Sequence, residues 1–259
     1  MSDELLYDVR DGIGRITLNR PQARNALTFA MYERLAAICG EVEGNGAVKA
    51  LVLTGAGDKA FAAGTDIGQF RDFKTAEDGL AYEARMDRVI DTLERCRVPT
   101  IAAVSGACTG GGAAIAAACD LRIAAANARF GFPIARTLGN CLSMANYARL
   151  AALIGIARTK EIIFTARLVE APEAQAIGLV GEVLPDHAAL MARADALART
   201  LAGHAPLTLR ATKEALRRIA ARMSPGEGDD LVAMCYTSAD FREGMAAFLE
   251  KRPPRWTGR

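Results

Sequence analysis

A run of three glycines constrains this chain more than any other feature of its sequence. Gly110, Gly111 and Gly112 lie between an apolar run at residues 100–104 and an alanine-rich run at residues 113–118. This order predicts a strand, a tight turn and the start of a buried helix. Glycine allows close backbone approach, and a helix N-terminus presents unpaired N–H groups with a positive dipole end. The turn therefore suits an oxygen atom that gains negative charge, although no acid or base lies in it or directly after it.

Composition limits the classes of partner. The chain has 259 residues, of which 51% are hydrophobic and 24% charged, so we expect one large domain or a domain with an appendage. The formal net charge is +2 and no basic tract carries interleaved aromatics, which argues against nucleic acid. Apolar runs fall far below the roughly 18 residues of a membrane span. Because residues 1–4 are acidic and lack a signal-peptide pattern, we expect a cytoplasmic protein without a membrane partner.

Cysteine and histidine usage argues against a metal centre. The six cysteines are scattered at positions 39, 96, 108, 119, 141 and 235, and no Cys-x-x-Cys pair occurs. With only two histidines in the chain, we expect no metal site. Reduced thiols are expected instead, with Cys39, Cys96 and Cys119 acting as small core residues.

Short strands and helices alternate along the first two thirds of the chain. Residues 5–9 and 13–18 flank Asp11-Gly12, which predicts a β-hairpin. Amphipathic helices are expected after Thr28 and over residues 80–96, the second closed by Pro99. Buried strands are expected at residues 50–53, 100–104 and 121–124. The alternation predicts an α/β fold in which sheets pack against helices.

The pattern changes to helices alone after Pro185. Apolar faces are formed by Leu190, Ala194, Leu197 and Leu201, and then by Leu207, Leu216, Ile219 and Met223. Residues 231–234 and 245–249 continue the helical pattern. Helices with two apolar faces can cover a core and also a neighbouring subunit, so we expect an oligomer.

A second glycine-bearing segment, residues 59–67, follows the strand at residues 51–53. Together with the glycine turn it gives two loops at the ends of neighbouring strands, each able to offer a backbone N–H to one oxygen. Other glycine-loop motifs do not fit. A dinucleotide fingerprint would require glycine where Ile115 stands, and no Gly-Lys pair or Gly-x-Ser-x-Gly elbow occurs.

Several segments, taken in their joint order and spacing, match one known family. They are residues 18–21 and 25–27, 60–67, 99–104 leading into 110–112, 119–122, 130–131, 174–179 and 243–252. The chain resembles the crotonase superfamily, the enoyl-CoA hydratase/isomerase group. The resemblance implies a superhelix of strand–strand–helix turns with a helical C-terminal trimerisation region. We therefore expect a core over residues 1–190, an oligomerisation region over residues 191–259, and a homotrimer or a dimer of trimers.

The resemblance also implies an oxyanion hole for the thioester carbonyl of an acyl-CoA. By position its two backbone N–H groups belong to Thr65 and Gly111. Removing an α-proton, adding to a C=C bond or losing a carboxylate all place charge on that oxygen, and one preorganised donor is typically worth about 10²–10³ in rate.

Coenzyme A contacts carry over from the family to a wider set of positions, with coenzyme A as part of the substrate and no covalently bound cofactor. They are Gln22, Ala23, Arg24, Ala63, Asp66, Ile67, Phe248 and Lys251. The family often takes its C-terminal aromatic and lysine contacts from a neighbouring subunit. Arg24 and Lys251 are expected to face phosphates, whereas the Asp66 side chain is expected to cap the short helix that follows it.

The chain departs from the family at the two glutamates with which hydratases position and activate water. Ala114 stands three residues beyond Gly111, and Ile134 follows the segment Phe-Gly-Phe-Pro. Neither side chain can accept or give a proton. Ordinary hydration and the standard isomerisation are therefore disfavoured.

Other side chains near the expected pocket could replace the missing acids. The candidates are Arg136, Asn140, Cys141, Tyr82 and Glu83. Arg136 could hold a substrate carboxylate, Asn140 could orient water, and Cys141 could act as a nucleophile or a polar contact.

Three hypotheses follow. The first is an acyl-CoA enzyme that stabilises an enolate and catalyses decarboxylation, thioester hydrolysis or C–C cleavage. The second is an enoyl-CoA hydratase or isomerase with a relocated base. The third is a non-catalytic acyl-CoA-binding subunit.

Overall fold

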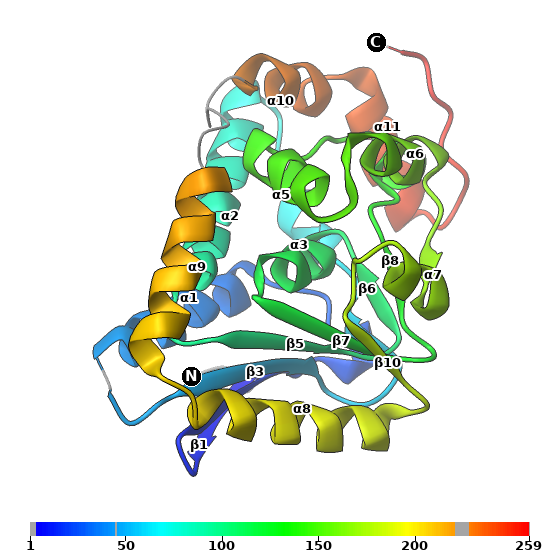
Figure 1. Ribbon diagram of the computed structural model, residues 1–259. Coiled ribbons are helices and arrows are strands. Elements are labelled where there is room, and N and C mark those ends of the chain that lie inside the picture. Colours follow the sequence, from blue (N-terminus) through cyan, green and yellow to red (C-terminus); the bar gives the residue numbers. More distant parts are fainter. Residues whose placement is uncertain (1–3, 45, 221–227, 259) are drawn as a thin grey trace.

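The computed structural model describes residues 4–44, 46–220 and 228–258, and it is built on two sheets (Figure 1). The larger sheet has the order β1 (Leu5–Arg10), β2 (Ile13–Leu18), β3 (Ala50–Gly55), β5 (Thr100–Val104), β7 (Leu121–Ala125) and β10 (Glu182–Leu184). The smaller sheet has the order β4 (Ala60–Ala62), β6 (Ala107–Thr109), β8 (Arg129–Gly131) and β9 (Val169–Glu170). The pairs β1–β2 and β8–β9 are antiparallel, and the other paired strands are parallel.

The helices follow the strands in a repeating order. They are α1 (Phe29–Gly44), α2 (Ala76–Arg95), α3 (Gly111–Ala118), α4 (Ile134–Thr137), α5 (Met144–Ile154), α6 (Ile156–Thr165), α7 (Ala171–Ala176), α8 (His187–Ala202), α9 (Pro206–Ala220), α10 (Asp229–Tyr236) and α11 (Ala239–Leu249), with 3-10 helices η1 (Pro21–Ala23) and η2 (Ile67–Phe70). The units β3–β4–α2, β5–β6–α3 and β7–β8–α4 each give one strand to each sheet and then a helix. This is the superhelix of strand–strand–helix turns that the family resemblance implied.

The central strands of the larger sheet are buried on both faces, which is why they read as continuous apolar runs rather than as alternating ones. Val52 and Ile101 pack against Leu190 and Ala194 of α8, whereas Leu53 joins the core formed with α1, α2 and α3. Figure 1 shows α8 along one side of this sheet and α3 on the other. Covering both faces fixes the ends of β3 and β5, from which the chain enters the smaller sheet.

Local signals explain several element boundaries. Asp11 and Gly12 both have positive φ, +51° and +77°, as a tight hairpin turn requires. The Thr75 hydroxyl accepts the amide of Asp78, and the Asp78 carboxylate accepts the amide of Thr75, so a capping box begins α2. The expected hairpin, both N-terminal helices and the strands at residues 50–53, 100–104 and 121–124 are confirmed.

The C-terminal part is helical, as the sequence predicted. Helix α8 crosses the expected boundary at residue 190 and packs on the larger sheet, so the division into residues 1–190 and 191–259 stays a prediction. Helix α9 has no buried side chain in the described chain, whereas α10 and α11 pack beside α2 and α4. Met223 and residues 1–3, which entered the sequence analysis, lie outside the described residues.

Candidate active site

A cleft of about 1030 Å³ lies where the loops of the smaller sheet meet α2, α4 and the end of α11. Its lining contains the predicted coenzyme contacts Gln22, Ala23, Arg24, Ala63, Asp66, Ile67, Phe248 and Lys251. It also contains Thr65, Gly111, Ala114, Ile134, Arg136, Asn140, Tyr82 and Glu83. Segments that are more than 200 residues apart in the sequence therefore form one concave surface.

The Thr65 amide is left free by the pairing of its own loop. The loop pairs in parallel with residue Leu27, whose N–H donates to Gly64 O and whose carbonyl accepts from Asp66 N, both at 2.8 Å. In such a bridge the central residue directs its own N–H to the opposite side. Among the described residues nothing accepts a hydrogen bond from the Thr65 amide, and Thr65 lines the cleft.

The Gly111 amide opens α3. Helix α3 has no side-chain cap, and the Gly111 N–H has no acceptor within the described chain. Each position of the turn requires glycine for a different reason. Gly110 has φ of +52°, a Cβ on Gly112 would lie 2.5 Å from Ala62 O, and a Cβ on Gly111 would lie 2.0 Å from the Tyr32 hydroxyl. The same Gly111 Cβ would lie 3.0 Å from Thr65 Oγ1, so the two loops are in direct contact.

A chain of hydroxyls supports the Thr65 loop. Thr65 Oγ1 lies 2.9 Å from the Tyr32 hydroxyl and 2.9 Å from the Tyr82 hydroxyl. Burial raises the pKa of both phenols well above the ordinary value, so they remain neutral. These hydroxyl contacts join α1 and α2 to the Thr65 loop and hold the loop against the N-terminus of α3.

The two positions at which the family resemblance led us to expect glutamates face the same cleft. Ala114 and Ile134 are each 7% exposed, and both contribute to the lining. Ala114 lies one turn into α3 from Gly111, and Ile134 begins α4. At these two positions the cleft is therefore lined by hydrocarbon beside backbone N–H groups, and neither side chain can titrate.

Polar side chains gather on the side formed by α2, where Tyr236 of α10 contacts the lining residue Glu83. The Tyr236 hydroxyl donates to Glu83 Oε1 at 2.7 Å, and Asn140 Nδ2 lies 3.3 Å from the same hydroxyl. Burial raises the pKa of Glu83 to about 7, outweighing the hydrogen bond from Tyr236 that lowers it. The Oδ1 atom of Asn140 is buried without a partner among the described residues. Glu83 is thus a carboxyl group that titrates near neutrality.

The structure corrects one expectation. Cys141 is not among the residues that line the cleft; its thiol is buried against α10, with Sγ 3.6 Å from Leu231 O. Contact with the Cys235 thiol and burial raise its pKa, which disfavours a nucleophilic thiolate. Arg136, in contrast, lines the cleft, is exposed and forms no ion pair with the described residues.

The rim of the cleft carries the expected coenzyme contacts. Asp66 caps η2 by accepting from Gly68 N at 3.0 Å, as the sequence predicted, and it also pairs with Arg20 at 2.9 Å. Phe248 and Lys251 reach the cleft of their own protomer, although the family resemblance suggested contacts that often come from a neighbouring subunit.

Two residues of the site escaped sequence reasoning. Tyr32 lies on α1 and Tyr236 on α10, and both read as ordinary members of helical segments. Buried phenols require hydrogen-bond partners, but the sequence does not say where those partners lie. Only the fold brings Tyr32 to Thr65 and Tyr236 to Glu83.

No helix in residues 4–44, 46–220 and 228–258 is long and apolar enough to cross a membrane. In the same ranges no three His, Cys, Asp or Glu side chains gather as metal ligands would.

Comparison with known proteins identifies the family. The sequence profile described as "Enoyl-CoA hydratase/isomerase" matches residues 8–259. A short-chain-enoyl-CoA hydratase of Clostridium acetobutylicum is 37% identical over 258 residues, covering 96% of each chain. A crystal structure of an enoyl-CoA hydratase/carnithine racemase from Magnetospirillum magneticum matches 100% of this chain and 97% of its own, with 34% identity and a TM-score of 0.81.

A third similarity adds a different chemistry. The structure of a methylmalonyl-CoA decarboxylase in complex with 2-nitronate-propionyl-CoA covers 100% of both chains, with 26% identity and a TM-score of 0.90. The profile match, the identity and the shared superhelix agree: the chain belongs to the enoyl-CoA hydratase/isomerase family, the crotonase superfamily.

Proposed function

We propose that this protein is an acyl-CoA enzyme that stabilises a thioester enolate with the amides of Thr65 and Gly111. The observation that carries the proposal is the pair of amides without internal acceptors on one wall of the cleft. Donors held in place before the reaction lower the energy of the charge that develops on the carbonyl oxygen, and the dipole of α3 adds to the effect.

Chemistry that does not depend on the glutamate pair is favoured. Ala114 and Ile134 leave no group to activate water at the usual positions. Decarboxylation, thioester hydrolysis and C–C cleavage all develop charge on the thioester oxygen, and decarboxylation ranks first. Arg136 supports it, because a guanidinium that lines the cleft and forms no ion pair with the described residues can hold a substrate carboxylate. The similarity to the methylmalonyl-CoA decarboxylase over the full chain points the same way.

The rim residues complete the substrate site. We place the pantetheine against the backbone of Ala63 and Ile67, and the adenine nucleotide near Gln22 and Phe248. Arg24 and Lys251 offer positive charge to the phosphates. The remaining proposed contacts, Ala23 and Asp66, also line the cleft.

A hydratase or isomerase with a relocated base is the second candidate. It is favoured by the names of the relatives and by Glu83, a carboxyl group that lines the cleft and titrates near neutrality. Turnover of crotonyl-CoA at ordinary enzyme rates, with methylmalonyl-CoA untouched, would select it over decarboxylation. Saturable binding of CoA esters with no turnover of any would select a non-catalytic binding subunit.

The test of the oxyanion proposal is the variant Thr65→Pro. It removes one N–H, and no backbone hydrogen bond is lost because the Thr65 amide has no acceptor in the described chain. The turnover number should fall about 10²–10³-fold while coenzyme A still binds. Thr65→Val is the matched control, since it keeps the amide and removes only the hydroxyl bonded to Tyr32 and Tyr82. Equal activity in Thr65→Pro and wild type, with the fold intact, would refute the proposal.

We further propose that residues 191–259 form the oligomerisation region of a homotrimer or a dimer of trimers. Helix α9 leaves Leu207, Leu216 and Ile219 at 77%, 62% and 62% exposure. An apolar helix face of this kind is commonly covered by another subunit. Light scattering should give a multiple of three chains, and Leu216→Glu with Ile219→Glu should reduce it. A wild-type monomer would contradict the proposal.

A further inference from the structure

The carboxylates that line the cleft differ in how they are used. Among the described lining residues these are Asp66 and Glu83. Asp66 is committed to η2 and to Arg20. Glu83 is 7% exposed and forms no ion pair with any described residue. Burying a charged carboxylate without a cation is costly, so such a group tends to be neutral. Its presence in a cleft marks it as a candidate functional residue.

The surroundings of Glu83 fix its position. Its partner Tyr236 is 2% exposed and packs directly on α2 at Gly79, where an added Cβ would lie 2.5 Å from the Tyr236 ring. A glycine inside a helix is less favourable than alanine. At this position it allows the close approach that brings the Tyr236 hydroxyl to Glu83 Oε1.

Glu83 also borders a second cavity. This cavity, of about 410 Å³, is lined by Glu83 together with Asp87, Ser143 and Asp229, among others. Glu83 thus belongs to the lining of both cavities. A carboxyl group in this place can exchange its proton with solvent on one side while an acyl group occupies the other.

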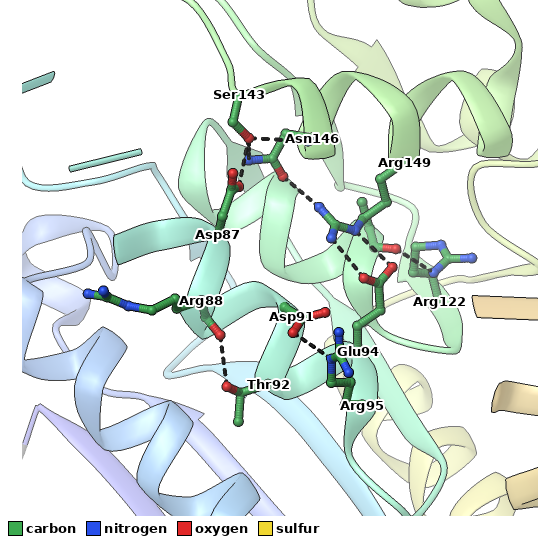
Figure 2. Close-up of polar contacts among 11 residues, drawn as sticks. Asp87, Arg88, Asp91, Thr92, Glu94, Arg95, Arg122, Ser143, Asn146 and Arg149 are labelled. Atoms are coloured by element: carbon green, nitrogen blue, oxygen red, sulfur yellow. Dashed lines mark hydrogen bonds and ion pairs between the residues drawn. The ribbon is translucent and has the colours of Figure 1, made fainter. Parts of the chain in front are cut away.

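A ladder of hydrogen bonds between α2 and α5 stabilises this boundary (Figure 2). Ser143 Oγ donates to Asp87 at 2.6 Å, and Arg149 forms a two-pronged contact with Glu94 at 3.0 and 2.8 Å. Asn146 joins the two by contacting both Ser143 and Arg149. The ladder keeps Ser143 beside Glu83, where its backbone amide is a hydrogen-bond donor.

We propose that Glu83 is the acid–base residue of the cleft and exchanges a proton with the α-carbon of the bound acyl-CoA, which rests on the proposed enolate chemistry. In one direction the α C–H bond breaks, the proton passes to the Glu83 carboxylate, and the electron pair forms the enolate held by the Thr65 and Gly111 amides. In decarboxylation the C–C bond breaks to give CO₂. The protonated Glu83 then protonates the α-carbon and regains a proton from water.

Other titratable groups that face Glu83 are neutral or act on it in a known direction. They are Tyr82 and Asp87 on α2, Tyr32 on α1, Tyr236 on α10, and Cys141 and Tyr147 near α5. Burial raises the pKa of the four tyrosines, and the proximity of Asp87 further raises the pKa of Glu83. The net result of burial and of these neighbours is a pKa of about 7 for Glu83.

The test is deuterium exchange at the α-carbon of butyryl-CoA in D₂O, followed by mass spectrometry. Glu83→Gln keeps the shape of the side chain and an oxygen for Tyr236 but cannot accept the proton. Exchange should fall by about 10²-fold or more, with unchanged affinity for butyryl-CoA. Glu77→Gln, an exposed position on the same helix, should exchange as wild type does. Wild-type exchange should fall below a pH of about 7, because only the carboxylate form removes a proton, and Glu83→Gln should lack this limb.

The outcomes separate the two proposals. Exchange at the wild-type rate in Glu83→Gln, together with its loss in Thr65→Pro, would overturn the role of Glu83 and leave the oxyanion hole standing. A wild-type protein that binds butyryl-CoA without exchanging it would also overturn that role. Wild-type exchange that survives in Thr65→Pro but not in Glu83→Gln would overturn the oxyanion hole alone. Glu83→Asp, which keeps a carboxylate, should retain part of the activity and guards against a purely structural effect.

Discussion

The two walls of the cleft are built from different materials. The wall at the N-terminus of α3 offers the backbone of Thr65 and Gly111 beside the hydrocarbon of Ala114 and Ile134. The wall of α2 carries Glu83, the proposed acid–base residue, whose carboxylate accepts a hydrogen bond from Tyr236 of α10. In the proposed mechanism, stabilisation of charge therefore depends on the ends of strands and on a helix terminus. Proton transfer depends instead on side chains, and these can stand at different positions in proteins that share one fold.

The backbone wall should be the less tolerant of change. Gly111→Ala places a Cβ 2.0 Å from the Tyr32 hydroxyl, which must displace either the ring or the N-terminus of α3. Because oxyanion donors act only at short range, we expect turnover to fall about 10²–10³-fold in steady-state assays. Gly111→Ala with Tyr32→Phe removes the colliding hydroxyl and should recover much of the loss. A double variant no better than the single one would show that the effect is not this collision.

The hydrocarbon beside the amides can be converted into the hydratase arrangement. Ala114→Glu together with Ile134→Glu places two carboxyl groups in the cleft next to Gly111. We expect hydration of crotonyl-CoA to rise about 10²-fold, since general acid–base catalysis contributes at least this much. The spectrophotometric assay for crotonyl-CoA measures it, and Ala114→Gln with Ile134→Gln is the uncharged control. Hydration by the wild type at the rate of the double glutamate variant would contradict the expectation that Ala114 and Ile134 disfavour hydration.

The sequence predicted more of the wall formed by Thr65 and Gly111 than of the wall that contains Glu83. The glycine run and its position between strand and helix predicted α3 and, through the family pattern, Gly111 and Thr65. Periodicity found the long helices and the buried strands, but not the three-residue strands β4, β6 and β8, which are too short to show a pattern. The Glu83–Tyr236 pair joins residues 153 positions apart. Such a contact depends on how α10 docks on α2, which no local pattern encodes.

The wall that contains Glu83 should also affect how the stability of the protein depends on pH. Glu83 has a pKa of about 7 in the folded chain and an ordinary value of 4.5, so the folded state keeps a proton that the unfolded state releases between these values. The free energy of unfolding should therefore fall as pH rises from about 4.5 to about 7 and change little above. Denaturant titrations at pH 5 and pH 8 should show Glu83→Gln losing about 2 kcal/mol less than wild type over this interval. Parallel losses in the two proteins would contradict the raised pKa.

The prediction with the smallest expected effect distinguishes the stability of helix α2 from the chemistry of Glu83. Thr75→Ala removes half of the capping box that begins α2, seven residues before Tyr82. The loss should destabilise the protein by about 1 kcal/mol in thermal or denaturant unfolding, the usual worth of an N-cap hydroxyl. Turnover should change little, because Glu83 is held by Tyr236 and by the ladder to α5 rather than by the start of its helix. Glu77→Ala in the same turn is the control for helix charge. A large fall in turnover with little loss of stability would mean that the first turn of α2 takes part in the site directly, and the wall would then have to be extended to include it.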